Sequence, residues 1–173
     1  MDAFVQRIFE TEVRFQCRAV LKAAEGIDDA LDRMDMESTS DVWVQIQTLL
    51  IAAANVSKLL WGSGAKKSQD RAALQAKLGV AADSPLADVP DLRNDFEHFD
   101  ERVEEWRAST TSTNFVGRNI GPASAIVIKG EPPNNRFQHF DPSTGEVSFL
   151  SRSVNLRPII AEAHRIGSLI DAG

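Results

Sequence analysis

Two long stretches in which apolar residues recur at helical spacing limit the fold of this chain more than any other sequence feature. The recurring residues of the first stretch, residues 1–34, are Phe4, Ile8, Phe15 and Ala19. Such spacing places side chains on one side of a helix. The run Ser38–Asp41 consists of residues that cap helix N-termini, and it opens a second stretch that ends near Trp61. We therefore expect two long helices, with Gly26 as the one weak point of the first.

Shorter segments follow, separated by glycine, proline and other helix-breaking residues. The predicted elements are a short helix over Ser68–Leu78, a fourth helix over Pro90–Ala108, a strand over Ser124–Ile128, a hairpin of Arg136–Phe140 and Glu146–Leu150, and a last helix over Leu156–Ile170. Ser109–Asn114 is rich in serine and threonine, and Gly117–Pro122 carries further breakers. We expect a flexible loop there.

These elements predict a mainly α protein with a single domain over residues 1–173. The expected architecture is an up-and-down bundle of four long helices plus one short helix. A loop and a small antiparallel β insertion over residues 109–153 precede the last helix. The apolar residues expected to form this sheet and cap the bundle are Phe137, Phe140, Val147 and Phe149.

The composition excludes several classes of protein. Cys17 is the only cysteine, so the chain forms neither an intrachain disulfide nor a thiolate zinc cluster, and we expect an inert packing residue. The net charge of −6 and the pI near 5.1 argue against a general nucleic-acid-coating role and leave room for a small basic site. The sequence contains neither an apolar run of the roughly 18 residues that span a membrane nor the pattern of a signal peptide. We expect a soluble, cytoplasmic protein.

The segment Leu92–Trp106 carries the most informative pattern. Its apolar residues fall on one stripe of a helix, namely Leu92, Phe96, Phe99, Val103 and Trp106. This stripe predicts a seam that faces the other helices of a bundle. The polar residues on the opposite side are Arg93, Asn94, Glu97, His98, Glu101 and Glu105. We therefore expect Arg93 and His98 to face solvent or another chain, about 140° apart around the helix axis.

The run Arg93-Asn94-x-x-x-His98 resembles the R-x-x-x-x-H motif of the HEPN superfamily, in which a polar residue often follows the arginine. HEPN domains are small helical bundles, and their motif lies on a late helix, as it does here. The resemblance covers about residues 1–108 and the last helix, and leaves out the β insertion. It implies a metal-independent endoribonuclease that forms a homodimer and brings two such helices together across a cleft. Toxins of this superfamily are often restrained by a partner, which implies an antitoxin or regulatory protein here.

The resemblance assigns chemistry to three residues. His98 would take a proton from the ribose 2′-hydroxyl or give one to the leaving oxygen, because histidine titrates near neutral pH. Arg93 would bind the phosphoryl oxygens, because its planar guanidinium stays charged. Asn94 would orient the histidine or the phosphate. The mechanism requires neither a metal nor a cofactor.

The charge of the same helix opposes RNA binding. Its acidic residues are Asp91, Asp95, Glu97, Asp100, Glu101, Glu104 and Glu105. RNA would need basic groups from elsewhere, and the candidates for substrate binding are Lys66, Lys67 and Arg118, with Lys129 and Arg136 in reserve. The alternative is a non-catalytic helical dimer or adaptor. In it, Arg93 and Glu97, four residues apart, form a solvated ion pair, and His98 is an ordinary interface residue.

Three further sequence patterns resemble functional sites, but we expect none of them to be one. Asp95-x-x-His98 resembles one half of a di-iron bundle site, but neither other histidine has an acid three residues before it, so we expect no metal site. Gly62–Ser68 lacks the glycine spacing of a phosphate-binding loop and is expected to be a connector. His139, on the predicted hairpin, is expected to lie at the surface.

Overall fold

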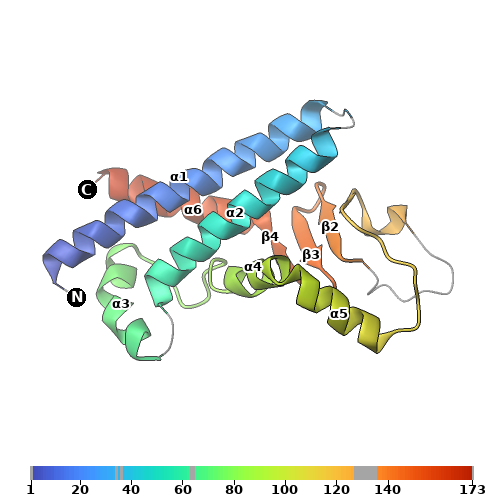
Figure 1. Ribbon diagram of the computed structural model, residues 1–173. Coiled ribbons are helices and arrows are strands. Elements are labelled where there is room, and N and C mark those ends of the chain that lie inside the picture. Colours follow the sequence, from blue (N-terminus) through green and yellow to red (C-terminus); the bar gives the residue numbers. More distant parts are fainter. Residues whose placement is uncertain (1, 34, 36, 63–64, 127–135, 173) are drawn as a thin grey trace. The chain divides into compact units, whose positions relative to one another are not determined.

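The chain forms two compact units, Met1–Pro90 with Pro158–Gly173, and Asp91–Arg157. The structure, a computed structural model, describes residues 2–33, 35, 37–62, 65–126 and 136–172, with the backbone alone at residues 65–70 (Figure 1). The protein is mainly helical, and a small sheet precedes the last helix, as predicted; the sheet has four strands and is mixed, so the purely antiparallel arrangement that was expected is wrong. A single domain over residues 1–173 stays a prediction.

Two long antiparallel helices, α1 (Ala3–Arg33) and α2 (Ser38–Trp61), form the framework of the first unit (Figure 1). Both agree with the predicted bounds. The buried residues of α1 are mostly small: Val13, Cys17, Val20, Ala23, Ile27 and Ala30. The two helices approach so closely at Gly26 that an added Cβ there would lie 2.7 Å from the Gln45 side chain. The glycine that looked like a weak point of α1 is therefore a point of contact.

The apolar stripe that predicted α1 is not its buried face. Phe4, Ile8 and Phe15 expose 66, 52 and 63% of their surface, whereas Val13 and Cys17 are buried. The spacing predicted the helix correctly but predicted the wrong face of it to be buried. Short side chains line the buried face, because they allow closer helix packing than phenylalanine does. Burial raises the pKa of the Cys17 thiol to about 12, and the charge of Glu162 adds to the effect, so the expected inert thiol is confirmed.

The helices α3 (Ala65–Lys77) and α6 (Leu156–Ala172) complete the first unit. Asp171 of α6 pairs with both Arg14 and Arg18 of α1, at 3.6 and 3.4 Å. Arg165 of α6 donates hydrogen bonds to the carbonyl oxygens of Leu78 and Gly79 in the turn that closes α3, at 3.0 and 3.2 Å. These contacts fix the C-terminal part of α6 to both α1 and the end of α3.

Among the described residues, α2 is the helix that is long and apolar enough to cross a membrane. This finding depends only on the length and composition of the helix, and buried core helices of globular proteins meet the same criterion. The buried residues of α2 include Trp43, Ile46 and Leu49, with relative exposures of 0 or 1%. Burial in the core of the first unit therefore explains its apolar character.

The second unit carries a small mixed sheet in the order β1-β2-β3-β4. The strands are β1 (Asn119–Ile120), β2 (Gln138–Asp141), β3 (Glu146–Phe149) and β4 (Arg152–Asn155). β1 runs parallel to β2, and the other pairs are antiparallel. The predicted hairpin is β2–β3, with Phe140 opposite Val147. Its turn ends at Gly145, whose φ of +81° favours glycine.

Two strands were not predicted, and one predicted strand is wrong. β1 and β4 are short and mostly polar, so they carry no apolar alternation that would reveal them. Ala123–Ala125 forms a 3₁₀ turn in place of the start of the strand predicted at Ser124–Ile128. Val127 and Ile128 lie outside the described residues. The four apolar residues predicted for the sheet, Phe137, Phe140, Val147 and Phe149, are all buried there.

Two isoleucines of α2 provide a matched test of the first unit's core. Ile46 has a relative exposure of 0% and Ile51 one of 46%. We expect Ile46→Ala to lower the free energy of unfolding by about 2–5 kcal/mol, because it removes apolar contacts and leaves a cavity. Ile51→Ala should cost less than about 1 kcal/mol. Urea unfolding followed by circular dichroism measures both, and equal losses would contradict this assignment of the core.

Candidate functional site

The helix predicted over Pro90–Ala108 is broken at His98. It consists of α4 (Val89–Glu97) and α5 (Phe99–Ser109), and His98 between them has φ −98° and ψ 40°, outside the helical region. The His98 amide still donates to the Asn94 carbonyl at 2.9 Å, and its carbonyl accepts from the Arg102 amide at 3.0 Å. The angle of about 140° between Arg93 and His98 assumed one straight helix, so it does not apply.

Aromatic side chains on both sides of the break pack on the sheet. Phe96 of α4 and Phe99 of α5 both lie edge-on against Phe149, at ring distances of 5.3 and 5.8 Å. Farther along α5, Trp106 lies 5.1 Å from Phe137. The stripe predicted to face the other helices therefore contacts the sheet of its own unit. Rings on both sides of His98 thus contact the same phenylalanine, Phe149.

Asp95 connects the two helices to the sheet. Its carboxylate lies 3.1 Å from Arg102 Nε of α5 and 2.8 Å from Arg152 Nε of β4. Arg152 also pairs with Asp91 at 3.1 Å. Asp95 is buried, although in the sequence it is one acid among several on this segment. Arg102 lies only seven residues after Asp95, whereas Arg152 lies 57 residues after it and comes within reach only through the folded sheet.

The structure places Arg93, Asn94 and His98 at the junction of α4 and α5. Arg93 forms an ion pair with Glu97, and 24% of its side chain is exposed. Asn94 is exposed. His98 exposes 52% of its side chain, and its Nδ1 lies 3.4 Å from Glu101 Oε1. A carboxylate at this position can orient the ring.

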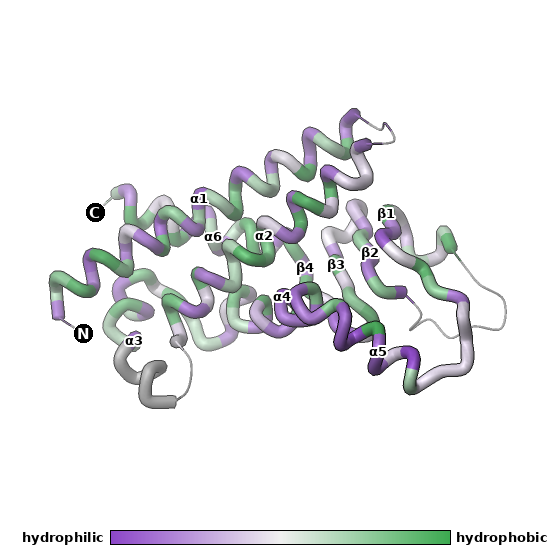
Figure 2. Tube along the Cα trace, viewed as in Figure 1, coloured by the Kyte–Doolittle hydropathy of each residue, from purple (hydrophilic) through white to green (hydrophobic). Residues whose placement is uncertain are grey.

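The acidic character of α5 remains in the folded protein. Figure 2 shows α4 and α5 as predominantly hydrophilic, and the exposed acids of α5 include Asp100, Glu101, Glu104 and Glu105. Glu105 pairs with Arg102, which hydrogen bonding and the nearby carboxylates hold at a raised pKa. The ion pairs along the two helices compensate several charges and leave the surface acidic.

The predicted substrate-binding residues divide between the two units. Arg118 belongs to the second unit, where its Nε donates to Gln138 Oε1 at 3.3 Å. Its φ of 29° is unusual for a residue other than glycine. Lys66 and Lys67 lie in α3 of the first unit, and their side chains are outside the described part. Lys129 also lies outside the described residues.

His139 is buried, so the predicted surface position is wrong. Only 4% of it is exposed, and its Nδ1 lies 2.8 Å from Asn119 Nδ2 across the β1–β2 pair. The asparagine amide donates, so Nδ1 must be unprotonated. Burial lowers the pKa of His139 and the charge of Arg136 lowers it further, whereas Asp141 and Glu146 oppose the shift. This histidine is a neutral part of the sheet.

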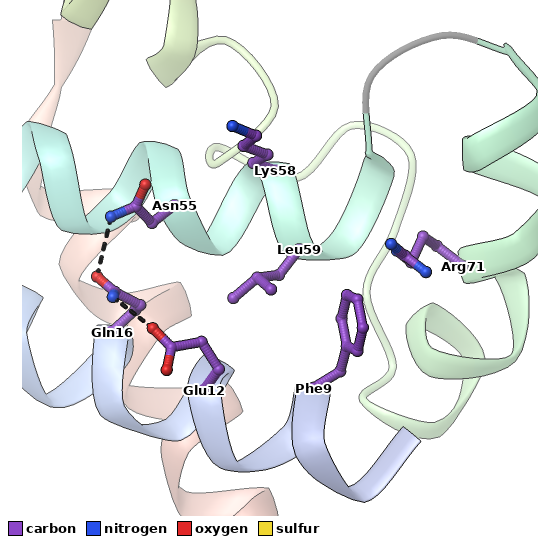
Figure 3. A pocket seen from close by; sticks show the side chains of 7 residues that line it. All are labelled: Phe9, Glu12, Gln16, Asn55, Lys58, Leu59 and Arg71. Carbon is purple, nitrogen blue, oxygen red and sulfur yellow. Dashed lines mark hydrogen bonds between the residues drawn. The ribbon is translucent and has the colours of Figure 1, made fainter. Parts of the chain in front are cut away.

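One cavity of the first unit, of about 390 Å³, is formed by α1, α2 and α3 (Figure 3). Asn55 donates to Gln16 at 3.3 Å, and Gln16 donates to Glu12 at 2.7 Å. The Arg71 guanidinium lies 4.0 Å from the centre of the Phe9 ring. Figure 3 shows the Asn55–Gln16–Glu12 group on one side of Leu59 and the Phe9–Arg71 pair on the other. Neither Arg93 nor His98 lines this cavity.

Within the described residues, no group of three or more histidine, cysteine, aspartate or glutamate residues could hold a metal ion. The chain matches no protein-family model, and neither a curated protein nor a solved structure is significantly similar to it. The candidate site therefore depends on its own geometry and on the motif.

His139 predicts how the stability of the second unit depends on pH. Its folded pKa lies below that of the unfolded chain, so the unfolded state binds more protons as the pH falls below about 6.5. The contribution of neutral His139 to the free energy of unfolding is therefore fully present above about pH 6.5. It is lost as the pH falls through the lower, folded pKa. We expect His139→Gln to reduce the drop in melting temperature between pH 7.5 and pH 5.0. His164→Gln, at an exposed position of α6, is the control and should leave the drop unchanged.

Proposed function

We propose that this protein is a HEPN-like, metal-independent endoribonuclease in which Arg93 and His98 act on RNA. The observation that carries the proposal is the position of His98. Its ring is exposed at the break between α4 and α5, a carboxylate lies 3.4 Å from its Nδ1, and Arg93 lies one helical turn away. An exposed imidazole held by a carboxylate is a suitable group for proton transfer.

The reaction that fits this site is cleavage by the ribose 2′-hydroxyl. A histidine removes the 2′-hydroxyl proton, the 2′ oxygen attacks phosphorus, and the bond from phosphorus to the 5′ oxygen breaks. The departing 5′ oxygen receives a proton, which gives a 2′,3′-cyclic phosphate and a 5′-hydroxyl end. The Arg93 guanidinium would stabilise the negative charge that develops on the phosphoryl oxygens. Asn94 would orient the phosphate or the histidine.

A homodimer completes this mechanism. One chain supplies one His98, whereas the reaction needs a base at the 2′-hydroxyl and an acid at the leaving oxygen. Two chains related by a two-fold axis through α4 would supply both. The up-and-down bundle of four long helices, a cytoplasmic location, Lys66 and Lys67 as further RNA contacts, and an antitoxin-like partner belong to the same proposal.

The Arg93–Glu97 ion pair favours a second candidate, the non-catalytic dimer or adaptor. The sequence analysis expected this pair in a protein that keeps the motif as an interface network. In an adaptor, Glu97 and Glu101 would hold Arg93 and His98 permanently, and no phosphate would replace them. Cleavage activity separates the two candidates.

The catalytic prediction concerns His98 and Arg93. We expect His98→Ala to lower cleavage of mixed single-stranded RNA by about 100-fold or more, because it removes the proton-transfer group. Arg93→Ala should have a comparable effect through lost charge stabilisation. His164→Ala, a histidine exposed on α6, is the matched control and should retain full activity. Activity should survive a chelator.

Both catalytic variants should keep the fold, because surface substitutions usually change stability by less than about 0.5 kcal/mol. Circular dichroism checks this. Equal cleavage by the wild type and both variants would identify a contaminating nuclease. An inactive wild type that forms the expected dimer would favour the adaptor.

The assembly prediction is a homodimer at micromolar concentration, measured by light scattering. We expect Asn94→Arg to shift the equilibrium toward monomer, because a two-fold interface contains each substitution twice. Thr48→Arg, at an exposed position of α2, introduces the same charge in the first unit and should leave the dimer intact. A monomeric wild type would contradict the composite site.

A further inference from the structure

A small pocket in the second unit is formed almost entirely by aromatic and apolar side chains. Its residues are Phe99, Val103, Trp106, Phe115, Gly117, Phe137 and Gln138. We call it the aromatic pocket. Its volume of about 200 Å³ lies below the roughly 300–1,000 Å³ of cavities for drug-sized ligands. It is therefore suited to one ring system.

Two rings of the aromatic pocket are more exposed than a core requires. Phe137 is only 3% exposed, whereas Phe99 and Phe115 expose 43 and 60%. Phe115 lies 6.5 Å from Trp106 and 5.7 Å from Phe137, so the pocket offers aromatic surfaces at its open side. Aromatic side chains at such sites stack on nucleobases, since every base has a π face.

The aromatic pocket also contains one buried polar group. Gln138 is 6% exposed, and its Oε1 accepts a hydrogen bond from Arg118 Nε at 3.3 Å. Because arginine can only donate, this bond identifies which end of the Gln138 amide is the oxygen. The other end, the amide nitrogen, is a hydrogen-bond donor. A donor in an apolar slot can recognise a carbonyl oxygen of a base such as uracil.

The loop that bears Phe115 differs in charge from α5. Arg107 donates to the carbonyl oxygens of Thr110 and Ser112, at 2.8 and 3.4 Å. Arg118 donates to an amide oxygen, and Arg136 donates to a backbone carbonyl at 3.0 Å. All of these acceptors are neutral, so within the described part of the chain these bonds do not offset the charges of the arginines. In the sequence, Glu131 is the only acid between Trp106 and Asp141. This side of the pocket favours a phosphate backbone over a basic peptide.

We propose that the aromatic pocket binds one unstacked base of a single-stranded RNA, with the RNA backbone along Arg118 and its neighbours. The inference rests on the proposed function. Phe99, a wall of the pocket, directly follows His98, and consecutive Cα atoms lie about 3.8 Å apart. A base held there brings its adjoining phosphate to the candidate catalytic histidine. The aromatic pocket would then select where the strand is cut.

The test uses a strand that cannot be cleaved, fluorescein-labelled 2′-O-methyl hexauridine, and measures its binding by fluorescence anisotropy at 50 mM salt. The wild type should bind this probe more tightly than the same backbone with abasic residues at every position. Phe115→Ala should weaken binding about 5-fold or more, as expected for the loss of one stacked base. Phe115→Trp, which keeps an aromatic ring, should restore it.

Two further variants separate base binding from general effects. Phe4→Ala removes an equally exposed ring, 66% exposed, from α1 of the other unit and should bind like the wild type. Arg118→Gln should weaken binding and lower the salt slope of the logarithm of affinity by about 0.7, the value for one phosphate contact with a single strand. The abasic comparison needs only the wild type, so it holds even if a variant fails to fold.

The outcomes distinguish the pocket from the proposed function. Tight, Phe115-dependent binding without any RNA cleavage would support the pocket and reject the ribonuclease. Cleavage by a protein that binds both probes equally would keep the ribonuclease and overturn the pocket. If only a short peptide with one phenylalanine between lysines binds, the pocket belongs to a protein partner and the inference is wrong.

Discussion

The buried carboxylate of Asp95 is the interaction on which the candidate site depends. It joins α4, which carries Asp95, to Arg102 of α5 and Arg152 of β4. Removing one partner of a buried pair costs more than the pair contributes, because the remaining charge loses its compensation. Both arginines also keep exposed surface, which moderates that cost. The two ion pairs thereby join the helices on either side of His98 to each other and to the last strand of the sheet.

The sequence predicted the helices of the first unit well, because long elements carry many repeats of their pattern. α1 and α2 lie within two residues of the expected bounds. The face of α1 could not be predicted in the same way. Phe4, Ile8 and Phe15 are larger and more apolar than the alanines and Cys17 that are buried. Where two helices pack closely, small side chains fit between them even when larger side chains are more hydrophobic.

The second unit was harder to predict, because its structure depends on contacts between distant residues. The stripe from Leu92 to Trp106 correctly gave apolar residues on one side, but no proline or glycine marks the break at His98. The ring that contacts both sides of the break, Phe149, lies more than 40 residues later in the sequence. Similarly, the burial of His139 follows from its pairing with Asn119 in the unpredicted strand β1. The motif positions could be read from spacing, whereas Asp95 and Arg152 could not.

The acidic surface of α5 does not exclude RNA, and the reason lies in the strength of the pairs involved. Arg93 and Glu97 are both partly exposed, and such pairs contribute only about 0.2–1 kcal/mol. A phosphate that binds Arg93 therefore has little to displace. The larger obstacle is repulsion from acids without a partner in an ion pair, and salt screens this beyond about 10 Å at 0.1 M. Arg118 and Arg136 lie outside the helix and would attract a phosphate backbone, since their hydrogen bonds within the described part of the chain go to neutral oxygens. A strand bound as proposed would therefore contact these arginines as well as the acidic helix that carries the residues next to His98.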